Sequence, residues 1–413
     1  MMRFSWRVSS ILVALALVAC GGSQASTVGV STPANETAPS IERDTADTSG
    51  TTAEVTGASA SVDVASRFNE AMSVAISGDT QDALARLLAL AEEQPDLADV
   101  WFNIGVLRAE TSDYGGAATA FQRAIEAEPE HGPALANLGF LQMSREAYTE
   151  ALSTFERCIV VEESEPGCNI NLAILYRMGF GNVEGDSSSA AIERLRFALG
   201  GDPQSAAAYE LLARVYSETG RLELARLVCE NAILLGIEDA VLHNRLGLIA
   251  LELDEVGAAY REFQAAVAID PALIEAQMNI AAMALSFRDY ESALSALQLV
   301  RVARPSDLEV RLSYGVALRG LDELDAAKLE YDAVLGSEPG HLGALYNLGI
   351  LQQEGFADYA AACGHYREFL SAPGASSAAK YDDVELRLGS LGDLLSALAE
   401  MGQVDPTVAA ACQ

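Results

Sequence analysis

The chain has 413 residues, of which half are hydrophobic and only 7% aromatic. Its formal net charge of −33 gives a surface that repels phosphate backbones and anionic lipid, which argues against nucleic-acid binding and against a peripheral membrane hold through basic patches. The acidity serves solubility in the simplest interpretation, and a specific basic partner is the alternative. Alanine and leucine dominate and strand-like runs are few, so the composition favours an all-helical chain.

Residues 1–19 have the features of a secretory signal peptide. Arg3 and Arg7 precede an apolar run from Ile11 to Ala19, which is too short to cross a membrane as a helix. The run ends in Leu-Val-Ala-Cys-Gly at residues 17–21, and this ending resembles the lipobox of bacterial lipoproteins.

The lipobox resemblance implies that the thiol of Cys20 receives a diacylglycerol and that cleavage makes this residue the acylated N-terminus, with palmitate as a typical acyl chain. Several acyl chains hold a protein stably at a bilayer. In such lipoproteins an Asp after the cysteine often retains the protein at the inner membrane, and here that residue is Gly21. We therefore expect a periplasm-facing lipid anchor in the cell outer membrane. A cleaved signal with an incidental cysteine is the alternative.

A polar segment follows the anchor. From residue 20 to residue 63 the chain is rich in Ser, Thr, Ala and Gly and almost lacks large apolar side chains. Such a segment cannot bury enough surface to fold. The sequence therefore predicts a disordered linker over 20–63.

The next part of the chain, 64–376, repeats at a period of 34 residues. One repeat shows Trp101, Gly105, Ala117, Phe121 and Pro129, and residues of these kinds return at the same offsets in later repeats. Glycine allows the first helix of a repeat to approach the second, and proline ends a helix because it lacks a backbone N–H. The pattern gives nine repeats, at approximately 64–97, 98–131, 132–165, 166–205, 206–239, 240–273, 274–307, 308–341 and 342–376.

The offsets resemble the signature of the tetratricopeptide repeat (TPR) family. The resemblance implies an all-α, right-handed superhelical solenoid of about nine helix-turn-helix repeats. Two repeats exceed 34 residues: the fourth has about six extra residues within Gly179–Ser189, and the ninth has about one near Gly355. An amphipathic stretch from Ala378 to Met401 predicts a capping helix within a C-terminal region, 377–413, because a solenoid end needs a cap.

In TPR arrays the first helices line a concave groove, chiefly through the fifth and ninth positions of each repeat. Most of these positions are apolar here, and an exposed apolar stripe marks a binding site. The stripe would take an apolar helix or an extended segment; the alternatives are that the superhelix packs it away or that the linker covers it. The candidate groove residues are Phe68, Met72, Phe102, Val106, Phe140, Met143, Ile170, Ile174, Met178, Leu248, Met278, Leu312, Val316, Tyr346 and Ile350.

Polar residues near the groove argue against the family's carboxylate clamp. That clamp pairs Lys with Asn on first helices. Here Asn103, Asn137 and Asn171 lie one position away and the lysines are missing. Glu210 and Arg214 interrupt the apolar stripe in the fifth repeat and divide the expected groove.

Six cysteines occur in a chain that we expect in an oxidising compartment. Cys158 and Cys168 fall on faces that pack together at a joint between repeats, so we predict a disulfide between them. A second pair, Cys363 and Cys412, would tie the C-terminal tail to the ninth repeat. Cys229 occupies an aromatic core position and is expected to be a buried thiol rather than a nucleophile.

The sequence shows no catalytic constellation. The four histidines are scattered, and the motifs of zinc hydrolases, nucleotide-binding loops and serine hydrolases do not occur. Acid-rich Glu184-Gly185-Asp186 is more typical of a solvated turn than of a cation site. We therefore predict a protein that is not an enzyme, with no cofactor and no metal.

Together these features predict a lipid-anchored periplasmic scaffold that holds envelope proteins. The architecture resembles bacterial TPR lipoproteins of the outer membrane that serve gliding-motility, type IV pilus or secretion machinery. An adaptor that delivers substrates to periplasmic proteases or cell-wall enzymes is an alternative. A catalytic protein with accessory repeats is another, although the chain has no room for a separate catalytic domain.

Overall fold

The computed structural model describes residues 60–181, 185–410 and 412. The described residues are mostly helical and include no strand, so the predicted all-α class is confirmed. The signal peptide, Cys20 and most of the predicted linker lie outside the described residues. No helix in the described part is both long enough and apolar enough to span a membrane.

The described helices form two compact units, divided between Leu253 and Asp254. The first unit holds α1 (Ala60–Ser77), α2 (Thr80–Glu93), α3 (Ala98–Glu110), α4 (Tyr114–Ala127), α5 (Gly132–Ser144), α6 (Tyr148–Val161), α7 (Pro166–Arg177), α8 (Ser187–Gly201), α9 (Ala206–Glu218), α10 (Leu222–Leu234) and α11 (Ala240–Glu252). The second holds α12 (Val256–Ile269), α13 (Ile274–Ser286), α14 (Tyr290–Ala303), α15 (Leu308–Gly320), α16 (Leu324–Ser337), α17 (Leu342–Ile350), η2 (Leu351–Gly355), α18 (Tyr359–Ser371), η3 (Ala375–Ser377), α19 (Tyr381–Glu400) and α20 (Pro406–Ala410).

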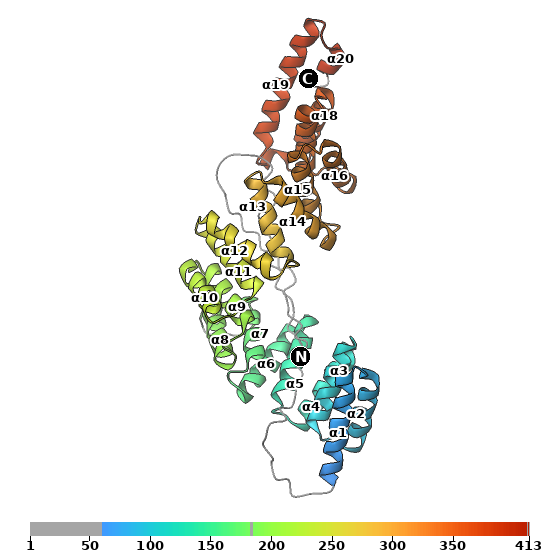
Figure 1. Cartoon of the computed structure of the whole chain (residues 1–413), viewed down its shortest axis with the longest axis vertical. Coiled ribbons are helices and arrows are strands. Elements are labelled where there is room, and N and C mark those ends of the chain that lie inside the picture. Colours follow the sequence, from blue (N-terminus) through green and yellow to red (C-terminus); the bar gives the residue numbers. More distant parts are fainter. Residues whose placement is uncertain (1–59, 182–184, 411, 413) are drawn as a thin grey trace. The chain divides into compact units, whose positions relative to one another are not determined.

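Within each unit, consecutive helices pack as hairpins and each hairpin packs on the next (Figure 1). The helices α1 to α18 follow the nine predicted repeats, two to a repeat. One boundary differs from the prediction, and the division into two units was not predicted. The unit boundary falls inside the sixth repeat, between α11 and α12. Helix α1 begins at Ala60, so residues 60–63 are helical and not linker; acidic Asp63 in the first turn favours this start.

Glycine and an aromatic ring hold the two helices of a repeat together. A Cβ added at Gly105 would lie 2.5 Å from Cε1 of Phe121, and one added at Gly139 would lie 2.6 Å from Cε1 of Phe155. Both rings are fully buried. The first helix can approach the second this closely only because the glycine has no side chain.

The turn inside a repeat uses one left-handed residue followed by a helix cap. Ser112 has a φ of 64° and Arg288 a φ of 61°, although neither is glycine. The next residue is an aspartate in both turns: Asp113 accepts a hydrogen bond from the backbone N–H of Gly116, and Asp289 accepts one from Ser292. The aspartate therefore starts the second helix of the repeat.

The extra residue of the ninth repeat is absorbed by a π-helical turn. After α17 the chain forms η2, in which Leu351–Gly355 follow the wider π pattern before α18 begins. A single inserted residue commonly produces such a turn inside an α-helix. In the fourth repeat, the extra residues lie between the end of α7 and the start of α8, where residues 182–184 are outside the described part.

The C-terminal region caps the ninth repeat with α19. Val384, Leu391 and Leu395 are buried against α18, whereas Leu386 and Leu394 are exposed. The cap is thus only partly polar on its outer face. The helix is also fastened by Asp383, which accepts a hydrogen bond from the hydroxyl of Tyr346 at 2.8 Å.

Candidate functional site

The candidate groove residues divide into three classes by exposure. One side chain is exposed, that of Met178, at 40%. Five are half-buried: Phe68, Met72, Ile170, Ile174 and Leu248. Nine are buried: Phe102, Val106, Phe140, Met143, Met278, Leu312, Val316, Tyr346 and Ile350. An open apolar groove along the whole array is therefore not what the structure has, and most of the stripe is interior packing.

Side chains of the second helix and of the joint that follows it explain why the stripe closes. The ring of Phe102 lies 5.8 Å from that of Phe121 on α4 and 5.1 Å from that of His131, the N-cap of α5. Met278 is covered by Arg304, the C-cap of α14, whose Nη1 lies 3.2 Å from the methionine sulfur. Residues of the second helix and of the joint thus fill the space that a ligand would need.

The partly open residues of the stripe lie on α1, α7 and α11, and the one exposed residue, Met178, is the C-cap of α7. Ile170, Ile174 and Met178 follow one another at four-residue spacing, which places them on one face of α7 and its C-cap. Leu248 is half-buried on α11, two first helices further on, and α9 packs against both helices. We call these four residues the inner patch. Their exposure makes the inner patch the best candidate for protein binding in the first unit.

A buried ionic cluster lies on the first helices beside the inner patch. The Glu210 carboxylate on α9 is only 2% exposed. It accepts hydrogen bonds from Nε and Nη2 of Arg245 on α11, at 2.9 and 2.6 Å, and from Nη2 of Arg214 at 2.8 Å. The cluster therefore ties the fifth repeat to the first helix of the sixth.

The charge state of Glu210 follows from its partners. Burial alone would raise the pKa of this carboxyl, but the charges of Arg214 and Arg245 and their hydrogen bonds lower the pKa to about 2. Glu210 is thus ionised at neutral pH, and the cluster is a buried ion network. Such networks are better known for specifying an arrangement than for adding stability.

The sequence indicated Glu210 and Arg214 but not Arg245. The missing signal was its position in the repeat: Arg245 occupies the slot that holds asparagine in several other repeats, such as Asn103 and Asn137. A long cation in this slot can reach a carboxylate on the preceding first helix.

The asparagines themselves serve their own helices. Asn103, Asn137 and Asn171 each donate from Nδ2 to the carbonyl four residues earlier, at 2.8, 3.0 and 2.8 Å, and all three are buried. One of the two N–H groups of each amide is therefore used within its own helix.

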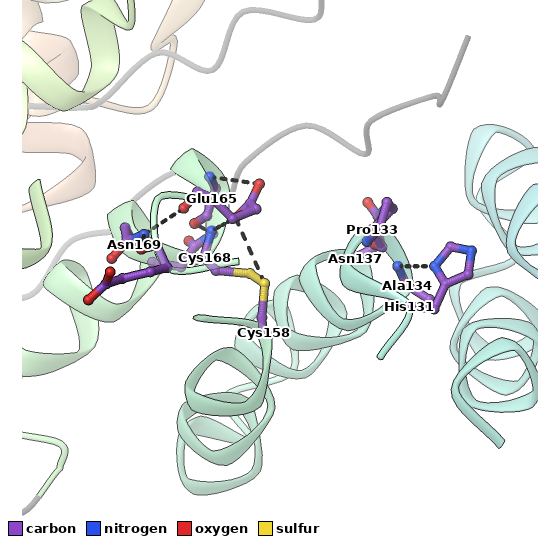
Figure 2. Close-up of a disulfide and its surroundings, with 11 residues drawn as sticks. His131, Pro133, Ala134, Asn137, Cys158, Glu165, Cys168 and Asn169 are labelled. Atoms are coloured by element: carbon purple, nitrogen blue, oxygen red, sulfur yellow. Dashed lines mark hydrogen bonds between the residues drawn. A yellow bond between two sulfur atoms is a disulfide. The ribbon is translucent and has the colours of Figure 1, made fainter. Parts of the chain in front are cut away.

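A disulfide joins Cys158 at the end of α6 to Cys168 at the start of α7, the pair expected from the sequence (Figure 2). Their Cα atoms are 6.4 Å apart, and both side chains are fully buried. At the equivalent places of the preceding joint, Ala124 and Ala134 are both fully buried. The disulfide thus replaces a small apolar contact that other joints use.

Glu165 completes the surroundings of this disulfide. Its carboxylate accepts hydrogen bonds from the backbone N–H groups of Gly167 and Cys168, so it caps α7. Figure 2 shows Glu165 beside Cys158 and Cys168. Among the described residues, Cys158, Glu165 and Cys168 form the one group close enough to share a metal ion. Because both sulfur atoms are in the disulfide, the group is structural in this state.

The second disulfide joins Cys363 on α18 to Cys412, so the tail after α20 is tied back to the ninth repeat. Cys229 is buried on α10 and belongs to neither disulfide. Two histidines cap helices at joints: the Nδ1 atoms of His131 and His341 accept from the backbone N–H groups of Ala134 and Ala344. All these side chains therefore stabilise joints or the core.

Comparison with known families agrees with this geometry. A tetratricopeptide-repeat family model matches residues 69–130, 107–160 and 184–241. The fold is a tetratricopeptide-repeat solenoid. Repeats of this type indicate a protein–protein interaction scaffold and are generally not enzymatic.

Solved structures of similar fold are distant in sequence. A crystal structure of MamA protein is 21% identical, covers 43% of this chain and 93% of its own, and has a TM-score of 0.36. The structure of pilF from Pseudomonas aeruginosa is 18% identical, covers 52% and 96%, and has a TM-score of 0.46. The Cut9–Hcn1 hetero-tetramer is 16% identical, covers 70% and 55%, and has a TM-score of 0.47. No curated protein sequence matches the chain.

Proposed function

We propose that this tetratricopeptide-repeat protein is a lipid-anchored scaffold on the periplasmic face of the outer membrane. Its inner patch holds an apolar helix or extended segment of another envelope protein during assembly of an envelope machine. Machines of the gliding-motility, pilus or secretion type are the expected clients, on the resemblance of the architecture alone.

The observation that carries the binding part of the proposal is the exposure of the inner patch. Ile170, Ile174 and Met178 present one apolar face of α7, where most other candidate groove residues are packed inside. Flexible methionine adapts to partners of different shape. The buried ion network of Glu210 and Arg214 lies on α9, which packs against both α7 and α11.

The two disulfides support the proposed location in the periplasm. Four of the six cysteines form two disulfides, and disulfides persist in oxidising compartments such as the periplasm. The lipobox-like ending at Cys20 supports export and acylation. A chain with these features is expected at a membrane surface outside the cytoplasm.

The anchor is tested by fractionation of cells that express the wild-type chain or Cys20→Ser, with radiolabelled palmitate in the medium. The proposal predicts labelled wild-type protein in the outer-membrane fraction and unlabelled variant protein released from it. Unlabelled wild-type protein, or a wild-type chain in the cytoplasm, would contradict the anchor.

The binding face is tested by a photo-crosslinking amino acid placed at Met178, with a matched placement at Leu329, which is 71% exposed on α16. Irradiation of intact cells should give defined adducts with envelope proteins from position 178 and not from position 329. Identical adducts at both positions would indicate nonspecific contact and would count against the inner patch.

A further inference from the structure

Helix α10 carries apolar side chains on two opposite faces. Ala225, Cys229 and Ala232 point into the core and are fully buried. On the other side, Leu224, Leu227, Leu234 and Leu235 are 45, 59, 85 and 49% exposed. A helix that is apolar on both faces is typical of a buried helix, so the second face of α10 is expected to be covered by something.

The four leucines line one side of α10 and its C-cap, with the exposed polar side chain of Asn231 between them. At 100° per residue, they fall within about 100° of each other around the helix axis. In the second repeat the equivalent positions are Gly116, Thr119, Glu126 and Ala127, which are small or polar. In the third repeat two of the equivalent positions, Val160 and Val161, are also apolar and exposed, so it is the full set of four leucines that distinguishes the fifth repeat. We call this stripe of four leucines the outer leucine face.

Acidic residues follow one edge of this face. Glu223 and Glu230 lie on the same side of the stripe, next to Leu227 and Leu234, and both are exposed. Glu223 is paired with Arg226 on the same helix, so Glu230 contributes most of the negative charge of this edge. The whole chain carries a formal net charge of −33. A partner that covers the leucines will therefore bind more tightly if it places cations along that edge.

We propose that the outer leucine face binds an amphipathic helix that carries lysine or arginine along one edge of its apolar stripe. This surface is on a second helix, whereas the inner patch is on first helices, so it would be a second docking site independent of the proposed function. Laying an apolar helix face against it is the usual mode of helix recognition.

Charge argues against the two other occupants. An antiparallel two-fold pairing of two copies brings the same edge of each helix together, so Glu223 and Glu230 would meet the same residues of the second copy. Anionic lipid would meet the same acidic edge and the strongly negative chain. A basic amphipathic helix satisfies both the apolar and the charged part of the surface.

The test uses the full-length chain and two synthetic helical peptides. Both peptides have leucines at alternating three- and four-residue spacing. One has lysine between the leucines, and the other has glutamate. Fluorescence anisotropy measures the Kd of each peptide for the wild type, for Leu227→Ser/Leu234→Ser, and for the matched control Val302→Ser/Leu329→Ser. The control also removes two exposed aliphatic side chains and leaves the charge unchanged.

The proposal predicts that the leucine–lysine peptide binds the wild type and the control alike and that the α10 variant binds it at least about tenfold more weakly. Glu223→Gln/Glu230→Gln should reduce the salt dependence of this binding. Equal binding to all three chains, or equal binding of the leucine–glutamate peptide, would overturn it. So would light scattering that shows a dimer lost in the α10 variant, or binding to anionic vesicles lost in it.

Discussion

The contact between a glycine and an aromatic ring decides how closely the helices of each repeat approach. In the ninth repeat, a Cβ at Gly349 would overlap the fully buried ring of Tyr366. Another glycine of the same hairpin, Gly364 on α18, has open space where a Cβ would be. The two residues differ only in what surrounds them, which makes them a matched pair.

Gly349→Ala is expected to lower the free energy of unfolding by about 1–3 kcal/mol because the methyl group forces the helices apart. Gly364→Ala is expected to raise it by about 0.5–1 kcal/mol, since alanine favours a helix. Chemical denaturation of both variants measures the difference. If the two substitutions had the same effect, close approach at Gly349 would not be what holds the repeat.

The ion network at Glu210 makes a pH prediction. Because the pKa of its carboxyl is lowered to about 2 in the folded chain, ionised Glu210 favours folding above its ordinary pKa of 4.5. This contribution is lost as the pH falls from about 4.5 to about 2. Glu210→Gln leaves Arg214 and Arg245 buried without their carboxylate and should cost about 3–5 kcal/mol at neutral pH.

The measurement is the unfolding free energy of wild type and Glu210→Gln across this range of pH. The gap between them should narrow below pH about 4.5, with Glu193→Gln, an exposed acid on α8, as the control that shows no such gap. A gap that stays constant down to pH about 2 would mean that folding does not lower the pKa of Glu210.

At the scale of elements, every joint between repeats has the same pair of buried positions. Cys158 and Cys168 occupy them at one joint, and Ala124 and Ala134 occupy them at the joint before, with the same separation of 10 along the chain. If the joints are equivalent, the alanine pair should accept a disulfide without distortion.

The double variant Ala124→Cys/Ala134→Cys is therefore expected to form a third disulfide, which mass spectrometry after alkylation detects as two fewer modified thiols. Ala117→Cys/Ala134→Cys, with the first cysteine two turns earlier on α4, is the control and should stay reduced. Oxidation of the control but not of the test pair would show that the joints are not equivalent.

The π turn of the ninth repeat connects the cap to the array. Arg387 on α19 donates to Glu354 in η2 at 2.8 Å and to Asp383 at 2.9 Å. Since these acids are well exposed to solvent, Arg387→Met should lower stability by only about 1 kcal/mol. Hydrogen exchange should nevertheless become faster in α19, whereas exposed Arg367→Met should leave it unchanged. If exchange in α19 were unchanged in both variants, the ion pairs of Arg387 would not be what holds the cap in place.

At the scale of the whole molecule, the periodic features could be predicted from sequence and the non-periodic ones could not. The 34-residue offsets of glycine, aromatic and proline residues predict eighteen helices and their pairing, because each residue acts within one repeat. The closure of the groove around Phe102 and Tyr346 depends on His131 at the joint after the second repeat and on Asp383 in the cap. The pattern of offsets within one repeat does not include those contacts.

Three other features escaped prediction for the same reason. Arg245 looks like an ordinary surface charge until its position opposite Glu210 is known. The unit boundary between α11 and α12 falls within a repeat whose pattern is regular in sequence. The one extra residue near Gly355 was visible as a count, but its π conformation follows from how α17 meets α18.

The central claim is that the inner patch holds envelope proteins, and crosslinking followed by affinity capture from intact envelopes tests it most directly. Ile174→Ala/Met178→Glu is compared with the wild type and with Val302→Ala/Leu329→Glu, which changes an exposed pair equally. The account predicts that a defined set of partners is lost from the inner-patch variant alone while its thermal unfolding stays the same. Recovery of the same partners by all three chains would contradict it.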